Sequence, residues 1–302
     1  MPGRQFAAPP ALELAATLAP LRHGPYDPTM SLASAECWRA SRAPAGPATL
    51  HLRLLGDVVE AEAWGPGADW ALDQAPALLG VLDEPAALRP VDPVVTELAR
   101  RHPGLRLPRT GRVVEALVPA VIEQKVTGLE AQRVYRRLIR VYGEAAPAAP
   151  GAPAGLRLQP APGRLASLPY HAFHPLGLER RRAETLIRVG MHAAALEASV
   201  ALAPAAARSR IQAIPGVGPW TATEAIRVAL GDPDAVSLGD YHLPTLVAWS
   251  LAGEAVADDA RMLELLEPYA GQRARVVRLL ELGGRLPPRR APRLPVRSIE
   301  RL

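Results

Sequence analysis

The stretch Ile-Gln-Ala-Ile-Pro-Gly-Val-Gly-Pro-Trp-Thr-Ala, residues 211–222, constrains the fold most strongly, because it predicts a helix, a tight turn and a second helix. The two glycines of the turn, Gly216 and Gly218, can adopt positive φ and let another chain approach the backbone closely. The N–H groups at the start of the second helix suit a phosphate. A lone Gly-x-Gly is usually an ordinary helix connection. This longer string is more specific and favours binding to a nucleic-acid backbone without contacts to the bases.

A second segment, Val-Ser-Leu-Gly-Asp-Tyr-His-Leu-Pro at 236–244, places Asp240 just before a helix that we expect over 241–252. Taken alone, Asp240 would be an ordinary N-cap. Taken with the hairpin motif upstream, it becomes a candidate catalytic carboxylate.

The rest of the pattern predicts an α+β fold, with a small N-terminal antiparallel sheet and helix followed by an all-helical body. Residues 36–42, 49–54 and 58–64 alternate between apolar and polar side chains, as strands do, and 69–79 has a helical pattern. Later helices are expected at 94–101, 113–124, 129–142, 178–188, 190–202, 206–213, 219–230, 241–252, 258–267 and 271–282. We expect a poorly ordered N-terminus at 1–30 and a small α/β domain at 31–92. A helical region should follow at 93–284, with two subdomains around a cleft and a flexible loop at 144–164. The chain should end in a Pro/Arg-rich tail at 285–302.

Charge and cysteine content narrow the function classes. The net charge of +5 and pI of about 9.8 favour a polyanionic partner, although a GC-rich genome would also enrich arginine. Lys125 is the only lysine among 35 basic residues, and Cys37 is the only cysteine. One cysteine excludes an intramolecular disulfide and any four-cysteine zinc or iron–sulfur site within the chain. No apolar run reaches the roughly 18 residues of a membrane span, and no secretion signal is evident, so we expect an intracellular, cytoplasmic protein.

These motifs together resemble the helix-hairpin-helix DNA glycosylases, in particular the bacterial 3-methyladenine DNA glycosylase II, or AlkA, type. The resemblance covers about 95–282 and rests on the strings PGLRLPRT (103–110), LVPAVIEQKVTG (117–128), IPGVGPWTA (214–222), SLGDYHLP (237–244) and LEPYAGQRARV (266–276). It implies a monomeric, nucleoid-associated enzyme of base excision repair that binds damaged double-stranded DNA and needs no cofactor. Such an enzyme flips an alkylated base out of the duplex and hydrolyses its N-glycosidic bond, leaving an abasic site.

The resemblance also assigns the chemistry of the pocket. Asp240 would stabilise the oxocarbenium-like sugar, and one carboxylate suffices because N-alkylated purines are already cationic leaving groups. Trp220, Tyr241 and Tyr269 would line the base pocket as π-rich walls. Glu224 departs from the aromatic residue common at its position; it could attract a cationic base, protonate a neutral one, or simply pair with an arginine. Strand-cutting relatives carry a Schiff-base lysine where Trp220 stands, so a glycosylase without lyase activity is expected.

Further residues are assigned to DNA contact. Gln124 and Lys125 match the position that probes the duplex where the base has left; Lys125 could fill the gap, bind a phosphate, or less expectedly attack the abasic sugar. The hairpin would bind the DNA backbone and could hold Na⁺ or K⁺ on the carbonyls of Gln212, Ile214 and Val217, with no metal site built from side chains. The residues assigned to backbone binding are Pro215, Gly216, Val217, Gly218 and Thr221.

Two other functions stay open, a glycosylase for deaminated or other neutral lesions and a non-catalytic damage-binding protein.

Overall fold

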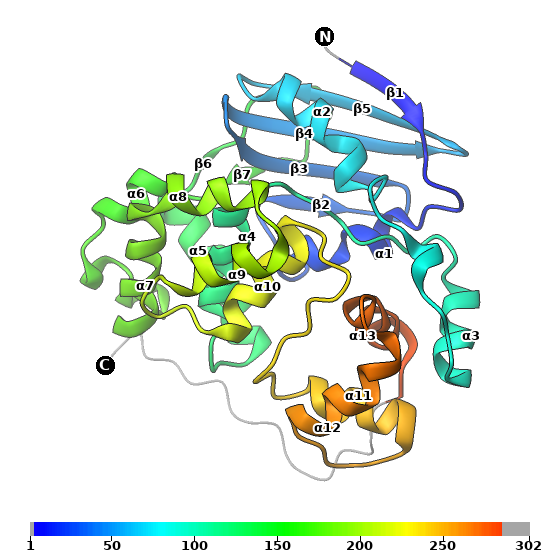
Figure 1. The fold of residues 1–302 in the computed structure, drawn as a ribbon. Helices are drawn as coiled ribbons and strands as arrows, with labels where there is room; N and C mark the ends of the chain where they lie inside the picture. Colours follow the sequence, from blue (N-terminus) through cyan, green and yellow to red (C-terminus); the bar gives the residue numbers. More distant parts are fainter. Residues whose placement is uncertain (1–2, 286–302) are drawn as a thin grey trace.

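The computed structural model describes residues 3–285 and opens with a five-stranded antiparallel sheet. Its strands are β1 (Gly3–Ala7), β2 (Met30–Leu32), β3 (Glu36–Ala43), β4 (Gly46–Leu55) and β5 (Val58–Trp64), in the order β1-β5-β4-β3-β2. Helix α2 (Ala68–Leu78) packs against β4 and β5 (Figure 1). Cys37, Leu52 and Ala61 are neighbours across β3, β4 and β5, and all three are buried in one core. The predicted N-terminal sheet and its helix are therefore confirmed.

The expectation of a poorly ordered N-terminus is wrong for residues 3–30. Strand β1 pairs with β5, and Leu14 and Leu18 of helix α1 (Leu14–Leu18) are fully buried. Strand β1 lies at the edge of the sheet and most of its side chains are exposed, so its sequence lacks the alternation that reveals a half-buried strand.

Eleven further α-helices follow within the described residues. The amphipathic pattern explains the long ones: α5 buries Ala131, Val134, Tyr135, Leu138 and Ile139, while Arg133 and Arg140 lie on its exposed face. The helices are α3 (Pro93–Arg101), α4 (Val113–Ile122), α5 (Gly128–Tyr142), α6 (Pro162–Ser167), α7 (Arg180–Met191), α8 (Ala193–Glu197), α9 (Pro204–Gln212), α10 (Pro219–Ala229), α11 (Leu243–Ala252), α12 (Asp259–Leu266) and α13 (Arg273–Gly283). None of the helices in the described range is long and apolar enough to cross a membrane.

The buried side chains form two clusters that do not follow the division expected at residue 92. One cluster joins the sheet and α2 to α4, α5, α7, α9 and α10, and the other joins α3 to α11, α12 and α13. Figure 1 shows α3 and α11–α13 set apart from the helices α4–α10. We call the first group the sheet lobe and the second the C-terminal lobe. Helix α3 thus packs with the end of the chain, which the order of elements along the sequence does not reveal.

The segment 144–164 is folded against the sheet lobe. Strand β6 (Glu144–Ala145) pairs with β7 (Arg157–Leu158), and Leu158 is fully buried. The Arg157 side chain donates hydrogen bonds to the carbonyls of Ile139 and Gly143 at the end of α5. The Ala/Pro/Gly content of segment 144–164 predicts a flexible loop, and these contacts show that this prediction is wrong. The expected Pro/Arg-rich tail lies, except for Arg285, outside the described residues.

Candidate active site

The helix-hairpin-helix is formed by α9, the turn 213–218 and α10, as predicted. Gly216 has φ of 97°, and a Cβ atom there would lie 2.0 Å from Thr185 Oγ1 of α7, so this position requires glycine. Gly218 has an ordinary extended φ of −89° and faces open space, where a ligand backbone can approach. Val217 is buried, and its N–H donates to the Ile214 carbonyl at 2.9 Å. The monovalent-ion site at this turn stays a prediction.

Asp240 and Trp220 are brought together across the two lobes. The indole Nε1–H of Trp220, at the start of α10, donates to Asp240 Oδ2 at 3.0 Å. The backbone N–H groups of His242 and Leu243, at the start of α11, donate to Asp240 Oδ1 at 2.8 and 2.9 Å. Three N–H groups therefore fix the orientation of this half-buried carboxylate.

A cavity of about 450 Å³ lies between α10, α11 and α13, and three of the predicted site residues line it. We call it the Asp240 cavity. Besides Trp220, Glu224 and Asp240, its lining includes aliphatic and polar side chains to which the sequence motifs assigned no role. These are Glu123, Arg227, Ser237, His242, Leu243, Leu246, Val277, Leu280 and Glu281.

The two predicted tyrosines do not line this cavity. Tyr241 is 84% exposed and stands edge-on to His242. Tyr269 is buried in the core of the C-terminal lobe, where its hydroxyl accepts the N–H of Asp92 at 3.0 Å. Trp220 is the one Trp, Tyr or Phe side chain in the described lining, beside the ring of His242, so the expectation that Tyr241 and Tyr269 form walls of this cavity is wrong.

Glu224 is held by two donors within the cavity wall. Its Oε2 accepts from Arg227 Nη2 at 2.7 Å, one turn further along α10, and its Oε1 accepts from the Ser237 hydroxyl. The neighbouring Glu224 carboxylate raises the pKa of Arg227 above its usual range. Of the three roles considered for Glu224, attraction of a cationic base, protonation of a neutral base and pairing with an arginine, the structure shows the pairing with an arginine.

The turn between α4 and α5 is fixed to the hairpin by Gln124. Its amide Nε2 donates to the Gly216 carbonyl at 3.0 Å and to Thr221 Oγ1 at 2.7 Å. Gln124 and the buried Thr221 thus bind each other, whereas the sequence predicted contacts to DNA for both. Lys125 follows at the tip of the turn, exposed and with a left-handed φ of 56°, a conformation that strains a residue other than glycine.

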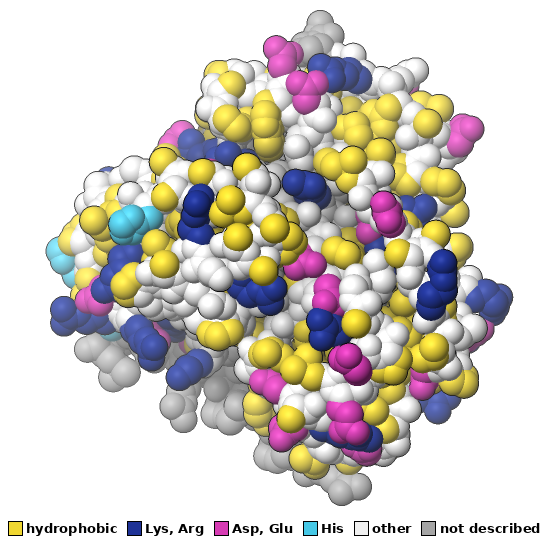
Figure 2. Space-filling model, in the orientation of Figure 1, with side chains coloured by type: hydrophobic (Ala, Val, Ile, Leu, Met, Phe, Trp, Pro, Cys, Tyr) yellow, Lys and Arg dark blue, Asp and Glu magenta, His cyan; other side chains and the backbone are white. Residues whose placement is uncertain are grey.

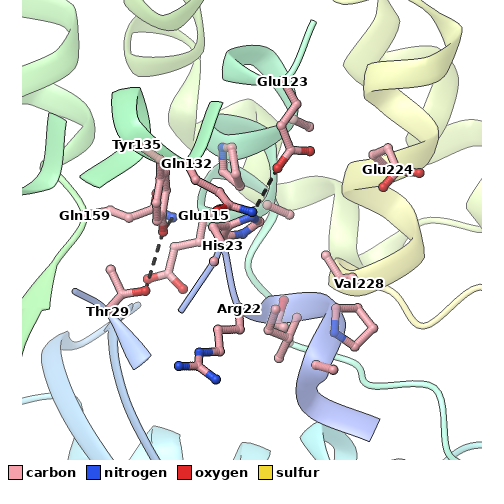
Figure 3. A pocket seen from close by; sticks show the side chains of 18 of the residues that line it. Arg22, His23, Thr29, Glu115, Glu123, Gln132, Tyr135, Gln159, Glu224 and Val228 are labelled. Carbon is pink, nitrogen blue, oxygen red and sulfur yellow. Dashed lines mark hydrogen bonds and ion pairs between the residues drawn. The ribbon is translucent and has the colours of Figure 1, made fainter. Parts of the chain in front are cut away.

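A second, smaller cavity of about 240 Å³ adjoins the first and shares Glu123, Glu224 and Arg227 with it (Figure 3). We call it the inner cavity. It lies beneath residues 19–24, between β3, α4, α5 and α10, and is lined by polar groups such as His23 and Gln132. His23 Nδ1 lies 3.3 Å from Glu123 Oε1. No sequence motif indicates this cavity, because its walls come from segments up to about 200 residues apart, from Ala19 to Val228.

Charge is unevenly distributed over the surface. Figure 2 shows Asp and Glu side chains gathered over the C-terminal lobe around α12, while Lys and Arg side chains lie along the edge of the sheet lobe around α7. On α7, Arg188 donates to the carbonyl of Pro215 in the hairpin at 3.3 Å. The hairpin thus sits beside basic side chains. Among residues 3–285, no group of three or more His, Cys, Asp or Glu side chains is arranged to hold a metal ion.

Comparisons of the sequence with known proteins give partial relatives, and no family model matches the chain. It is 32% identical over 153 residues to a probable bifunctional transcriptional activator/DNA repair enzyme AlkA of Mycobacterium tuberculosis, over 50% of this chain and 30% of that protein. It is also 32% identical over 136 residues to DNA-3-methyladenine glycosylase 2 of Escherichia coli, over 44% of this chain and 46% of that protein. The chain therefore matches less than half the length of these curated relatives.

Solved structures match over nearly the whole chain. A 3-methyladenine DNA-glycosylase from Archaeoglobus fulgidus has a TM-score of 0.74 at 17% identity and covers 92% of this chain and 97% of its own. An 8-oxoguanine glycosylase/lyase of Clostridium acetobutylicum in complex with DNA has a TM-score of 0.68 at 12% identity, over 89% of this chain and 90% of its own. The α+β fold and the resemblance to the AlkA type of helix-hairpin-helix glycosylase are confirmed.

Proposed function

We propose that this chain is a DNA glycosylase that flips alkylated bases of the 3-methyladenine class out of duplex DNA and hydrolyses their N-glycosidic bond. The observation that carries the proposal is the Asp240 carboxylate, held by the Trp220 indole and the first N–H groups of α11 at the wall of a cavity of about 450 Å³. Pockets of roughly 300–1,000 Å³ take small-molecule ligands, so one nucleobase fits. The names of the partial relatives support the same activity.

The chemistry follows from the fixed carboxylate. As the bond between the base and C1′ of the sugar breaks, positive charge develops on the sugar. A carboxylate that is already oriented stabilises this charge without reorganising, and its oxygen can also direct the attacking water. A base that is already cationic leaves without a proton donor, so Asp240 is sufficient for this substrate class.

DNA would bind to the hairpin and to the turn between α4 and α5, which Gln124 fixes to the hairpin. Gly218 leaves space at the N-terminus of α10 for a phosphate, and Arg188 supplies positive charge beside the hairpin. Lys125, exposed at the tip of its turn, would enter the place that the flipped base leaves. We infer that a single copy of the chain binds damaged double-stranded DNA.

The product would be an abasic site without strand cleavage. Schiff-base chemistry needs an amine at the sugar, and the described lining of the Asp240 cavity contains no lysine. By the resemblance, Trp220 stands where strand-cutting relatives carry their Schiff-base lysine, and Lys125 lies outside the described lining of the Asp240 cavity.

The test is the release of free bases from methylated duplex DNA, identified by mass, by the wild type and by Asp240→Asn. Wild type should release 3-methyladenine or 7-methylguanine, and the variant should lose at least about 100-fold in rate because it lacks the charge. Asp258→Asn is the matched control, since Asp258 also caps a helix, accepting from the N–H of Arg261 at 2.9 Å.

Two outcomes would contradict the proposal. Equal rates for the wild type and Asp240→Asn would remove the catalytic role of Asp240. Binding of methylated DNA by the wild type without release of any base would instead support a non-catalytic damage-binding protein. Thermal melts of each variant separate loss of activity from loss of fold.

A further inference from the structure

Helix α7 contacts both segments that are assigned to DNA binding, the hairpin and the turn between α4 and α5. Arg182, near the start of α7, is only 3% exposed, and its Nη1 donates to the Ile122 carbonyl at 2.7 Å. Ile122 is the last residue of α4, directly before the turn that carries Lys125. The buried guanidinium of Arg182 therefore connects α7 to the start of that turn.

Two side chains further along α7 contact the hairpin. Thr185 is fully buried and lies so close to Gly216 that a Cβ atom on the glycine would come within 2.0 Å of its Oγ1. Arg188 donates to the Pro215 carbonyl at 3.3 Å. Residues 182, 185 and 188 are spaced by three, so they lie along one side of the helix. That side of α7 holds the hairpin and the turn at a fixed separation.

The hydrogen bond from Arg182 caps the C-terminal end of α4. The last carbonyls of a helix lack partners within it, and a positive charge is favourable at that end. Three residues after Ile122, Lys125 has a left-handed φ of 56°, so the chain changes direction sharply there. The position of the Lys125 side chain therefore depends on where the end of α4 is held.

A contribution to stability does not by itself account for a buried arginine at this place. Burial lowers the pKa of Arg182 below its usual range, which means that burying its charge costs free energy. Its ion-pair partner Glu179 lies 3.5 Å away and is 55% exposed, so this pair offsets little of that cost. Apolar side chains of similar volume often replace buried charged pairs without loss of stability. A role in fixing geometry explains the arginine better.

We propose that Arg182 is a positioning residue for base flipping. It holds the end of α4 against α7 and so sets the place of Lys125 relative to the hairpin. Lys125 then enters the duplex beside the lesion while the hairpin binds the DNA backbone. This inference rests on the proposed glycosylase function. Arg182 itself does not contact the base, because it is not part of the described lining of either cavity.

A positioning role predicts a loss that is confined to the flipping step. Taking a base out of the stack costs free energy in a paired duplex and costs least where the base is already unpaired. A displaced Lys125 should therefore slow release of a paired lesion and have little effect on an unpaired one. Damage to the fold or to the Asp240 cavity would instead slow release of both lesions together.

The experiment measures single-turnover release of 7-methylguanine from two duplexes, one with the lesion opposite cytosine and one with the lesion in a single-nucleotide bulge. Arg182→Met keeps a long unbranched side chain but removes the donor to the Ile122 carbonyl. We expect it to slow release of the paired lesion about 10-fold more than release of the bulged one. Arg182→Lys keeps the charge and a donor, so its ratio of the two rates should lie between those of the wild type and Arg182→Met.

Arg106→Met is the matched control, because Arg106 is also a buried arginine that donates to backbone carbonyls. It is 7% exposed, lies outside the described lining of both cavities, and should leave the ratio of the two rates unchanged. The carbonyls that it binds are those of Pro10, Pro103 and Leu105.

A double variant tests whether Arg182 acts through Lys125. Lys125→Ala already lacks the probing side chain, so adding Arg182→Met should slow release of the paired lesion little further. Losses that multiply in the double variant would show that the two residues act independently.

The outcomes separate this inference from the proposed function. The inference is overturned by an equal fall of both rates in Arg182→Met, by the same change of ratio in Arg106→Met, or by independent losses in the double variant. Should thermal melts show that Arg182→Met does not fold, an unchanged ratio in Arg182→Lys would overturn it as well. Each of these results leaves the proposed function standing. A wild type that releases no methylated base from either duplex would refute the proposed function itself.

Discussion

Gln124 connects the turn that carries Lys125 to the hairpin, and its removal should have a measurable cost. Its amide donates to the Gly216 carbonyl at 3.0 Å and to Thr221 Oγ1 at 2.7 Å. A net contribution of about 1 kcal/mol for each hydrogen bond predicts that Gln124→Ala lowers the free energy of unfolding by about 2 kcal/mol. Thr221 is only 2% exposed, so water does not readily replace the lost donor.

This cost is measurable by urea and thermal denaturation. For a chain of this length, 2 kcal/mol corresponds to a fall in Tm of about 3 °C. We also expect binding to a duplex containing an abasic site to weaken about 10-fold in Gln124→Ala, because Lys125 would no longer be fixed relative to the hairpin. Binding to the same duplex without the abasic site should change less, since the hairpin still grips the backbone.

A double-mutant cycle with Thr221→Val isolates the interaction. Valine has the shape of threonine but lacks the hydroxyl that accepts from Gln124. If the hydrogen bond at 2.7 Å is what couples the two side chains, the double variant should lose about 1 kcal/mol less than the sum of the single variants. Additivity within about 0.3–0.5 kcal/mol would refute the coupling between Gln124 and Thr221 and leave the hydrogen bond to the Gly216 carbonyl to hold the turn.

Two further predictions concern the hairpin and the exposed lysine. Gly216→Ala should destabilise the fold by more than 1 kcal/mol, because its Cβ would meet Thr185 Oγ1 at 2.0 Å and φ is 97°, whereas Gly218→Ala should leave Tm within about 1 °C and weaken DNA binding instead. Lys125→Ala should leave Tm nearly unchanged and reduce affinity for damaged duplex and turnover; unchanged affinity and turnover would exclude a probing role for Lys125.

Much of the fold could be predicted from local patterns, because most elements bury one regular face. The strands β3, β4 and β5 and the long helices show this periodicity in sequence. The hairpin and the place of Asp240 just before α11 could be identified because each depends on residues close together in the chain. Strand β1 could not, because it contributes backbone hydrogen bonds at a sheet edge and has mostly exposed side chains.

The cavity walls were less predictable for a different reason. Trp220 and Asp240 stand at helix starts and were both assigned to one site from their motifs, and the structure brings their side chains into contact. The direction of Tyr241 and Tyr269 depends on how each packs within the C-terminal lobe, which no local motif determines. Glu123 and His23 are 100 residues apart and meet only because residues 19–24 fold back over α4 and α5.

The position of Asp240 also depends on how the two lobes meet. Trp220 begins α10, which is packed in the core of the sheet lobe, whereas the carboxylate binds the first N–H groups of α11, which is packed in the core of the C-terminal lobe. The indole–carboxylate hydrogen bond therefore crosses the boundary between two separate cores. A displacement of one lobe by more than about 0.2 Å along this 3.0 Å bond would lengthen it past the usual range. Substitutions at the lobe boundary, far from Asp240 in sequence, should thus reduce turnover before they reduce stability.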